Sequence, residues 1–171
     1  MGAKSKSKNS ADINKEALLR AILDRLEQEL ELFVKAARFS HAEATHEQNK
    51  AEDKYDTRGL EASYLARGQS RQVAELEQAI KKFESLELQP LSSKDPINLG
   101  AYVELEGGQE NSYYFVGPTA GGTEVQFEKK EVLVITPQSP LGQQLVGKKQ
   151  SEEMLVDIAG KKTKYRIVRV A

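Results

Sequence analysis

Several residue types on which whole classes of function depend are missing from this chain of 171 residues. It has no cysteine, which excludes disulfides, thiolate metal sites and cysteine nucleophiles. It has no tryptophan, and no apolar run approaches the roughly 20 residues that a membrane-spanning helix needs. The N-terminal MGAKSKSKNS lacks the apolar segment of a secretory signal. We therefore expect a cytoplasmic protein that makes no membrane contact.

Neither sign of charge is in clear excess, because the formal net charge is only -1 and the pI is about 6.2. A chain without a basic excess is a poor candidate for charge-driven DNA binding. The only histidines, His41 and His46, are five residues apart, so on a helix they lie on different faces and form no metal pair. Neither G-x-x-x-x-G-K-[ST] nor G-x-G-x-x-G occurs. The sequence shows no active site of its own, and we expect that the protein is not an enzyme.

Proline divides the chain into two parts of different composition. Residues 12–87 contain no proline, whereas residues 90–171 contain all five. The stretch 88–96, LQPLSSKDP, has the composition of a linker. Lysine and serine dominate residues 1–11, which predicts a disordered tail. We therefore expect a tail at 1–11, one domain at 12–87, a linker at 88–96 and a second domain at 97–171.

The first domain has the period of an antiparallel coiled-coil hairpin. Two stripes follow alternating steps of three and four residues: Leu19, Leu23, Leu26, Leu30, Phe33, Ala37, Ser40, Ala44, Glu47, Ala51 and then Ala62, Ala66, Gln69, Val73, Leu76, Ile80, Phe83. An antiparallel pairing of Leu30 with Phe83 satisfies both stripes in one register and places the turn within residues 54–59. Large apolar residues fill the base and small or polar ones the far end, which predicts a slim and weakly stable tip.

The second domain reads as an antiparallel sheet with one helix on its face, so the fold class is α+β. Strands are expected at 99–107, 111–117, 131–135, 153–159 and 163–170, with a hairpin turn at Gly160-Lys161. Residues 139–148 predict a short helix with Ser139 as its N-cap and Pro140 at its first position. No aromatic-lined pocket is expected in this domain, which argues against prolyl isomerase activity.

The hairpin turn brings several charged residues to the far end of the first domain. Asp53, Asp56 and Glu61 are acidic, and their oxygens are suited to Mg²⁺, which often takes only one or two protein carboxylates. Lys54 and Arg58 are basic and are candidates for facing RNA phosphates, or for offsetting the neighbouring carboxylates. The tip is therefore either a solvated turn or a probe that completes a metal site in another protein.

The segment ITPQSPLGQQLVGKKQSEEM, residues 135–154, resembles the C-terminal signature of the bacterial Gre family of transcript cleavage factors. The following strands, ending in YRIVRV, fit the same family. A weaker match is Ala62-Ser63-Tyr64, which is similar to the family's A-x-Y segment at the start of the second hairpin helix. With the order of hairpin and sheet, the resemblance covers about residues 12–171.

This resemblance implies an FKBP-like C-terminal domain that docks on RNA polymerase, and a hairpin that enters the polymerase secondary channel. It implies that Ser139, Pro140, Leu141 and Gly142 form the polymerase-contact loop. It further implies that tip carboxylates, here Asp56, Glu61 and Asp53, share a Mg²⁺ of the polymerase active centre. That metal activates the water that cleaves backtracked RNA. The protein would then need no cofactor of its own, would meet nascent RNA indirectly and would act as a monomer.

The tip departs from the family pattern D-x-x-E-N. Aligned on Tyr64, Thr57 takes the place of the aspartate and Leu60 that of the glutamate, while Asp56 and Glu61 lie one position away. Three functions are therefore open: a factor that stimulates RNA cleavage, a channel binder that does not, or a coiled-coil adaptor for another partner.

Overall fold

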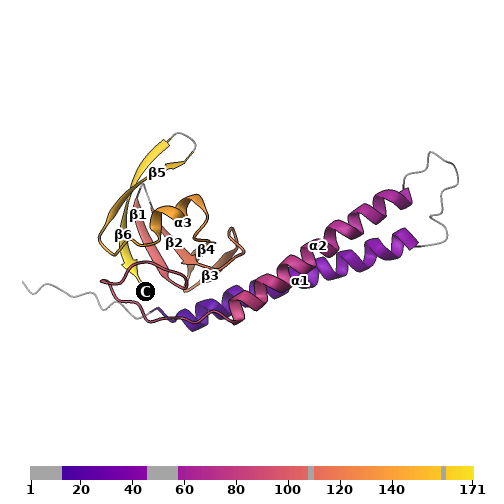
Figure 1. The fold of residues 1–171 in the computed structure, drawn as a ribbon, viewed down its shortest axis with the longest axis horizontal. Helices are drawn as coiled ribbons and strands as arrows, with labels where there is room; N and C mark the ends of the chain where they lie inside the picture. The colour runs from indigo at the N-terminus through magenta and orange to yellow at the C-terminus, as the bar shows by residue number, and fades with distance from the viewer. Residues whose placement is uncertain (1–12, 46–57, 108–109, 159–160) are drawn as a thin grey trace, which may run out of the picture.

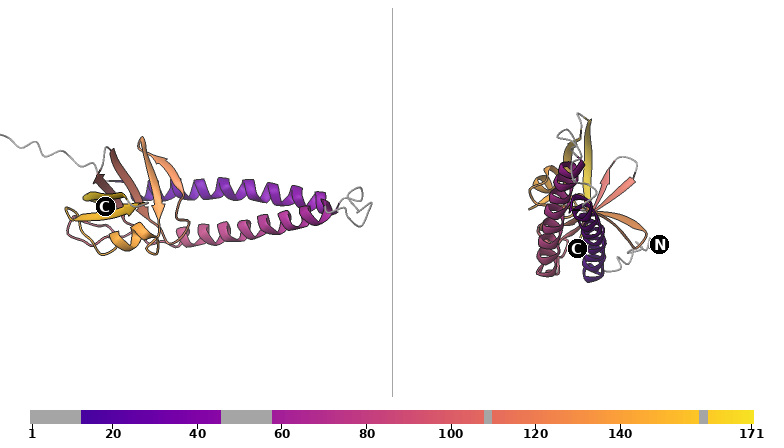
Figure 2. Two further views of the ribbon diagram at one scale, coloured as in Figure 1. Left: turned by 90° about the horizontal axis from the view of Figure 1, so that it is seen from above. Right: turned by 90° about the vertical axis from the view of Figure 1, so that its right-hand side faces the viewer.

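The computed structural model describes residues 13–45, 58–107, 110–158 and 161–171, and it has two parts. Two long antiparallel helices project away from a sheet that carries one short helix (Figures 1 and 2). This is the α+β architecture that the sequence predicts. The elements are α1 (Lys15–Thr45), α2 (Arg58–Glu84), β1 (Tyr102–Gly107), β2 (Glu110–Val116), β3 (Glu124–Phe127), β4 (Lys130–Ile135), α3 (Pro140–Leu145), β5 (Glu153–Ile158) and β6 (Lys161–Val170).

Local chemistry sets the ends of the two long helices. Asn14 caps α1, since its side-chain oxygen accepts a 2.9 Å hydrogen bond from the Ala17 N–H. Lys81 and Lys82 lie in the last turn of α2, where positive charge suits the helix dipole. Helix α2 already includes Arg58 and Gly59, which the sequence had placed in the turn. A glycine is tolerated there because first-turn N–H groups need no intrahelical partner. The rest of the predicted turn and the predicted tail lie outside the described residues.

The sheet has the order β3-β4-β2-β1-β6-β5. Four of its pairings are antiparallel, but β2 and β4 are parallel, which corrects the expectation of a wholly antiparallel sheet. The reason is β3, a strand of four residues that the sequence analysis missed. After β2 the chain passes the position of β4 and forms β3 at the edge. A tight turn at Glu128 and Lys129, both with positive φ, then leads back into β4, which lies between β3 and β2.

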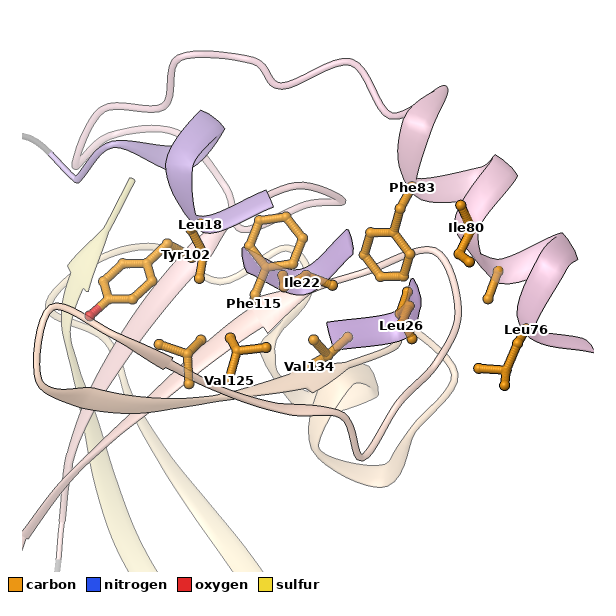
Figure 3. Packing of buried hydrophobic residues seen from close by; sticks show 12 residues of the cluster. Leu18, Ile22, Leu26, Leu76, Ile80, Phe83, Tyr102, Phe115, Val125 and Val134 are labelled. Atoms are coloured by element: carbon orange, nitrogen blue, oxygen red, sulfur yellow. The ribbon is translucent and has the colours of Figure 1, made fainter. Parts of the chain in front are cut away.

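The base of the hairpin is packed on one face of the sheet. Leu18, Ile22 and Leu26 of α1 share a buried cluster with α2 and with four strands (Figure 3). The sequence had placed Leu19 and Leu23 at the helix interface, and these are only half-buried. Leu18 and Ile22 are fully buried because the base of α1 meets the sheet as well as α2. A single heptad stripe describes only one of those two contacts.

Burial along the rest of the hairpin follows the predicted stripes. Leu76, Ile80 and Phe83 are buried near the base, and Ser40 is the buried polar residue of the outer part. Ala37, Ala66 and Val73 are half-buried. The outer hairpin thus has the small and polar interior that the sequence predicts. The predicted pairing of Leu30 with Phe83 is wrong, since Phe83 packs with Ile22 and Leu26 of α1 (Figure 3). Leu76 likewise shares a groove with Leu26 and Glu29 rather than with Ala37.

The contact between α2 and the sheet depends on a glycine. Phe83 is 0% exposed, and a Cβ added to Gly117 would lie 2.8 Å from its ring and 2.9 Å from a methyl group of Val134. The Phe83 ring therefore occupies the space that any other residue at position 117 would need. This close approach fixes where the base of α2 sits on the sheet.

Gly117→Ala is expected to lower the free energy of unfolding by about 1–3 kcal/mol, because the added methyl group overpacks this contact. Urea unfolding followed by circular dichroism measures the change. Gly121→Ala is the matched control, since position 121 is exposed and its nearest contact would be 3.3 Å away. Equal stability of Gly117→Ala and the unmodified chain would show that the Phe83 contact is not tight.

Candidate partner-binding site

The four residues expected to contact a partner, which we call the Ser139–Gly142 loop, consist of the N-cap Ser139 and the first turn of α3. The Ser139 hydroxyl donates to the Thr136 carbonyl at 2.8 Å and accepts from the Gly142 N–H at 3.1 Å. The Ser139 N–H also donates to the Thr136 carbonyl, at 3.0 Å. Ser139 is therefore the N-cap of α3, as predicted, and its hydroxyl is used inside the loop.

Gly142 is required by the same loop. It is buried, and a Cβ at this position would lie 1.9 Å from the Thr136 carbonyl oxygen. No side chain fits in that space, so the glycine allows α3 to start close against the end of β4. Ser139 and Gly142 thus shape the loop, whereas Pro140 is exposed and Leu141 is half-buried. The last two are the residues that the loop presents.

Pro140 and Leu141 stand at the edge of an apolar hollow of about 320 Å³. The hollow lies between α3 and the face of the sheet opposite to the hairpin, and mostly apolar side chains from five strands, β1, β2, β4, β5 and β6, form its floor. Its lining consists of Leu105, Tyr114, Leu133, Ile135, Ser139, Pro140, Leu141, Gln144, Val156 and Tyr165. A concave apolar surface beside a rigid loop is a typical docking site for an apolar side chain.

Two tyrosines line this hollow, which corrects the expectation that the domain has no aromatic-lined pocket. Tyr165 lies over Gly107, where an added Cβ would be only 2.4 Å from its ring. Burial raises the pKa of Tyr114, and a hydrogen bond with Ser112 opposes that shift. Tyr114 is therefore neutral at physiological pH. Tyr114 thus adds no charge to the mostly apolar lining of the hollow.

The strand residues of the hollow could not be identified as site residues from the sequence. Leu105, Tyr114 and Val156 look like ordinary alternating strand residues, and only the fold brings them together with α3. The available signal was the position of the Ser139–Gly142 loop, because residues that face a docking loop are candidates for the same site.

The predicted tip residues are only partly within the described chain. Asp53, Lys54 and Asp56 lie outside the described residues, as does His46. Glu61 is in the first turn of α2 and is exposed, and Arg58 is the first residue of that helix. The structure therefore does not test whether Asp56 and Glu61 come together. His41 is exposed in the last turns of α1.

Within residues 13–45, 58–107, 110–158 and 161–171, no group of three or more His, Cys, Asp or Glu side chains is placed to hold a metal ion. In the same residues, no helix combines the length and the apolarity needed to cross a membrane.

Sequence comparison finds relatives for both parts of the chain. Residues 92–171 match the family described as transcription elongation factor, GreA/GreB, C-term. The chain is 28% identical over 152 residues to the transcription elongation factor GreA of Nitratidesulfovibrio vulgaris strain Miyazaki F, covering 86% of this chain and 89% of that one. It is also 28% identical to the protein of the same name from strain DP4, over 85% of this chain and 86% of that one.

Comparison with solved structures finds the GreA factor homolog 1 (Gfh1) of Thermus thermophilus, at 25% identity and a TM-score of 0.37. That alignment covers 88% of this chain and 95% of the other. Gfh1 of Thermus aquaticus aligns at 23% identity and a TM-score of 0.38, over 88% of this chain and 94% of the other. At these TM-scores the structural likeness carries no argument, and the resemblance to GreA/GreB factors rests on the sequence matches.

Ser139→Ala is expected to lower the free energy of unfolding by about 1 kcal/mol, since it removes the N-cap of α3 and the bond to Thr136. Thermal unfolding measures the loss, and Ser139→Asp should recover part of it because aspartate is also a good N-cap. Gln143→Ala, on the exposed side of α3, is the control. If Ser139→Ala is as stable as this control, the loop does not depend on the hydroxyl.

Proposed function

Because the chain is a divergent member of the Gre family, we propose that it is a transcription elongation factor that binds RNA polymerase through its sheet domain. The hollow beside α3 receives part of the polymerase, and the hairpin reaches into the secondary channel. The observation that carries this proposal is the rigid loop that presents Pro140 and Leu141 beside an apolar hollow. The residues of that loop are those that the family resemblance assigns to polymerase contact.

The shape of the hairpin supports a reaching role. Helix α1 has 31 residues, which corresponds to about 46 Å at 1.5 Å per residue. Only its base is packed on the sheet, so the outer part is free to enter a channel. Its small interior residues let the two helices approach closely and keep the shaft narrow. A long and narrow projection from a docking domain suits delivery of residues to a distant active centre.

The proposed chemistry belongs to the polymerase, with carboxylates supplied from this chain. Asp56 and Glu61, with Asp53, would hold a Mg²⁺ that the polymerase also binds, and carboxylate oxygens fit that ion. Bound there, the ion supplies a water of lowered pKa for hydrolysis of an RNA phosphodiester. Glu61 is an exposed carboxylate in the first turn of α2, which suits contact with a partner. Lys54 and Arg58 would face the RNA backbone.

A second function is favoured by the spacing of the tip acids. Asp56 and Glu61 are five residues apart, whereas the family pattern places its two acids three apart. Because Arg58 to Glu61 are already helical, the direction of Glu61 is set by the start of α2. A chain that docks in the same way but cannot bring both acids to one ion would occupy the channel without stimulating cleavage.

Leu141→Asp is expected to raise the dissociation constant for bacterial core RNA polymerase by at least about tenfold, because it places a charge at the edge of an apolar contact. Fluorescence anisotropy of labelled protein measures the affinity, with thermal unfolding as a check of folding. Val146→Asp, just after α3 and outside the hollow, is the control. Unchanged affinity of Leu141→Asp would exclude the hollow as the docking site. No binding of the unmodified chain would favour an adaptor for another partner.

The cleavage role is tested on a backtracked polymerase complex with 3′-labelled RNA. The unmodified chain should shorten the RNA. A variant with alanine at 53, 56 and 61 should still bind, but the rate of RNA cleavage with it should be at least about 100-fold lower. The affinity assay above shows whether binding is kept. If the unmodified chain binds but does not stimulate cleavage, the second function is correct. If the triple variant cleaves normally, the tip carboxylates are not ligands.

A further inference from the structure

Lys15, the first residue of α1, ties the linker to the base of the hairpin. Its Nζ donates a 2.6 Å hydrogen bond to the carbonyl of Gln89, which lies 74 residues further along the chain. Ile13 and Leu88, which are close to these two residues in the sequence, pack against the apolar cluster at the hairpin base. Lys15 is therefore half-buried at a junction between a helix and the linker, instead of extending into solvent.

The surroundings of Lys15 disfavour the charged form of its amine. Burial lowers the pKa of Lys15, because an ammonium loses more hydration than a neutral amine. The start of a helix is the positive end of its dipole, which also disfavours a cation. Among the described residues, no carboxylate forms an ion pair with Lys15. Glu16 is exposed, and adjacent residues of a helix do not face each other.

The other lysines that the structure describes in the two long helices have the opposite surroundings. The Lys35 Nζ is 2.7 Å from a carboxylate oxygen of Glu31, and the Lys35 side chain is 68% exposed. Hydration and a nearby carboxylate both favour the ammonium form. Lys81 and Lys82 lie in the last turn of α2, where the helix dipole favours a cation. Of these four lysines, Lys15 is the one whose surroundings favour a neutral and nucleophilic amine.

We propose that Lys15 is a modification site, acylated on its Nζ by a small acyl phosphate such as acetyl phosphate. The neutral amine keeps a lone pair while it donates to Gln89, and a desolvated lysine amine is an effective nucleophile. It attacks the carbonyl carbon, so that an amide C–N bond forms and the C–O bond to phosphate breaks. Phosphate leaves with the electron pair of that bond, and the nitrogen loses one proton to solvent. This inference does not depend on polymerase binding.

Acylation of Lys15 would release the linker from α1. The Nζ now lies 2.6 Å from the Gln89 oxygen, and an acyl group on the nitrogen needs space at this contact. The product amide carries no charge, so the hydrogen bond to the carbonyl also becomes weaker. The backbone of residues 88–96 should then open more often. The modification would thus act on the segment that joins the hairpin to the sheet domain.

The first test treats the full chain with acetyl phosphate and follows the acetylated fraction of each lysine by peptide mass spectrometry. Lys15 should react at least about threefold faster than Lys35, because the fraction of neutral amine sets the rate. Glu31→Gln is the matched control, since it removes the carboxylate beside Lys35 and should speed acetylation there without changing the rate at Lys15. A rate at Lys15 equal to or below that at Lys35 in the unmodified chain would overturn the proposal.

The second test measures hydrogen exchange of the backbone amides in residues 88–96. Exchange should be faster in the acetylated protein and in Lys15→Gln, which lacks the charge and the length to hold Gln89. Lys15→Arg keeps a charged donor and cannot be acylated in this way, so its exchange should stay slow with and without acetyl phosphate. Thermal unfolding checks that both variants fold. If acetylation at Lys15 leaves exchange in 88–96 unchanged, the proposed effect on the linker is wrong.

Discussion

The contact of Phe83 with Gly117 joins the helical hairpin to the sheet domain. The ring is fully buried, and it fills the space where a side chain at position 117 would stand. Leu18, Ile22 and Leu26 of α1 enter the same cluster, so both helices are held by the sheet. A projection about 46 Å long can place its end reproducibly only if its base does not turn. The shared core supplies that constraint, and every role proposed for the hairpin depends on it.

Stability is distributed unevenly along the hairpin. The buried apolar residues of both helices lie near the base, at 18–26 and 76–83, whereas the outer interior contains Ser40 and Gln69. The side-chain oxygen of Gln69 is buried without a hydrogen-bond partner in the structure, which costs about 1–3 kcal/mol. The larger apolar residues of the outer part, Leu32, Phe39 and Leu65, face outward instead. Because little apolar surface is buried in the outer part, the hairpin is stabilised only weakly there.

The sequence predicted the elements whose pattern is local and failed where burial depends on the fold. Heptad spacing identified both long helices, and Ser139 with Pro140 identified the start of α3. The sequence did not show that Leu18 and Ile22 are more buried than Leu19 and Leu23, because their neighbours belong to a sheet that begins only at Tyr102. Strand β3 was missed because it has only four residues, and the direction of β4 was wrong for that reason. From the sequence, the tyrosines of the hollow could be recognised only as strand residues, because only the fold brings them beside α3.

The Ser139–Gly142 loop and the contact between Phe83 and Gly117 are both held by the end of β4. The Gly117 N–H donates to the Ile135 carbonyl at 2.8 Å, and the next residue, Thr136, holds Ser139 through its own carbonyl. Val134 packs toward Phe83 on one face, whereas Ile135 lines the hollow on the other. Successive residues of β4 thus support the hairpin and the docking surface, as the alternation of a strand requires. The Ser139–Gly142 loop is therefore connected to the base of the hairpin through one strand.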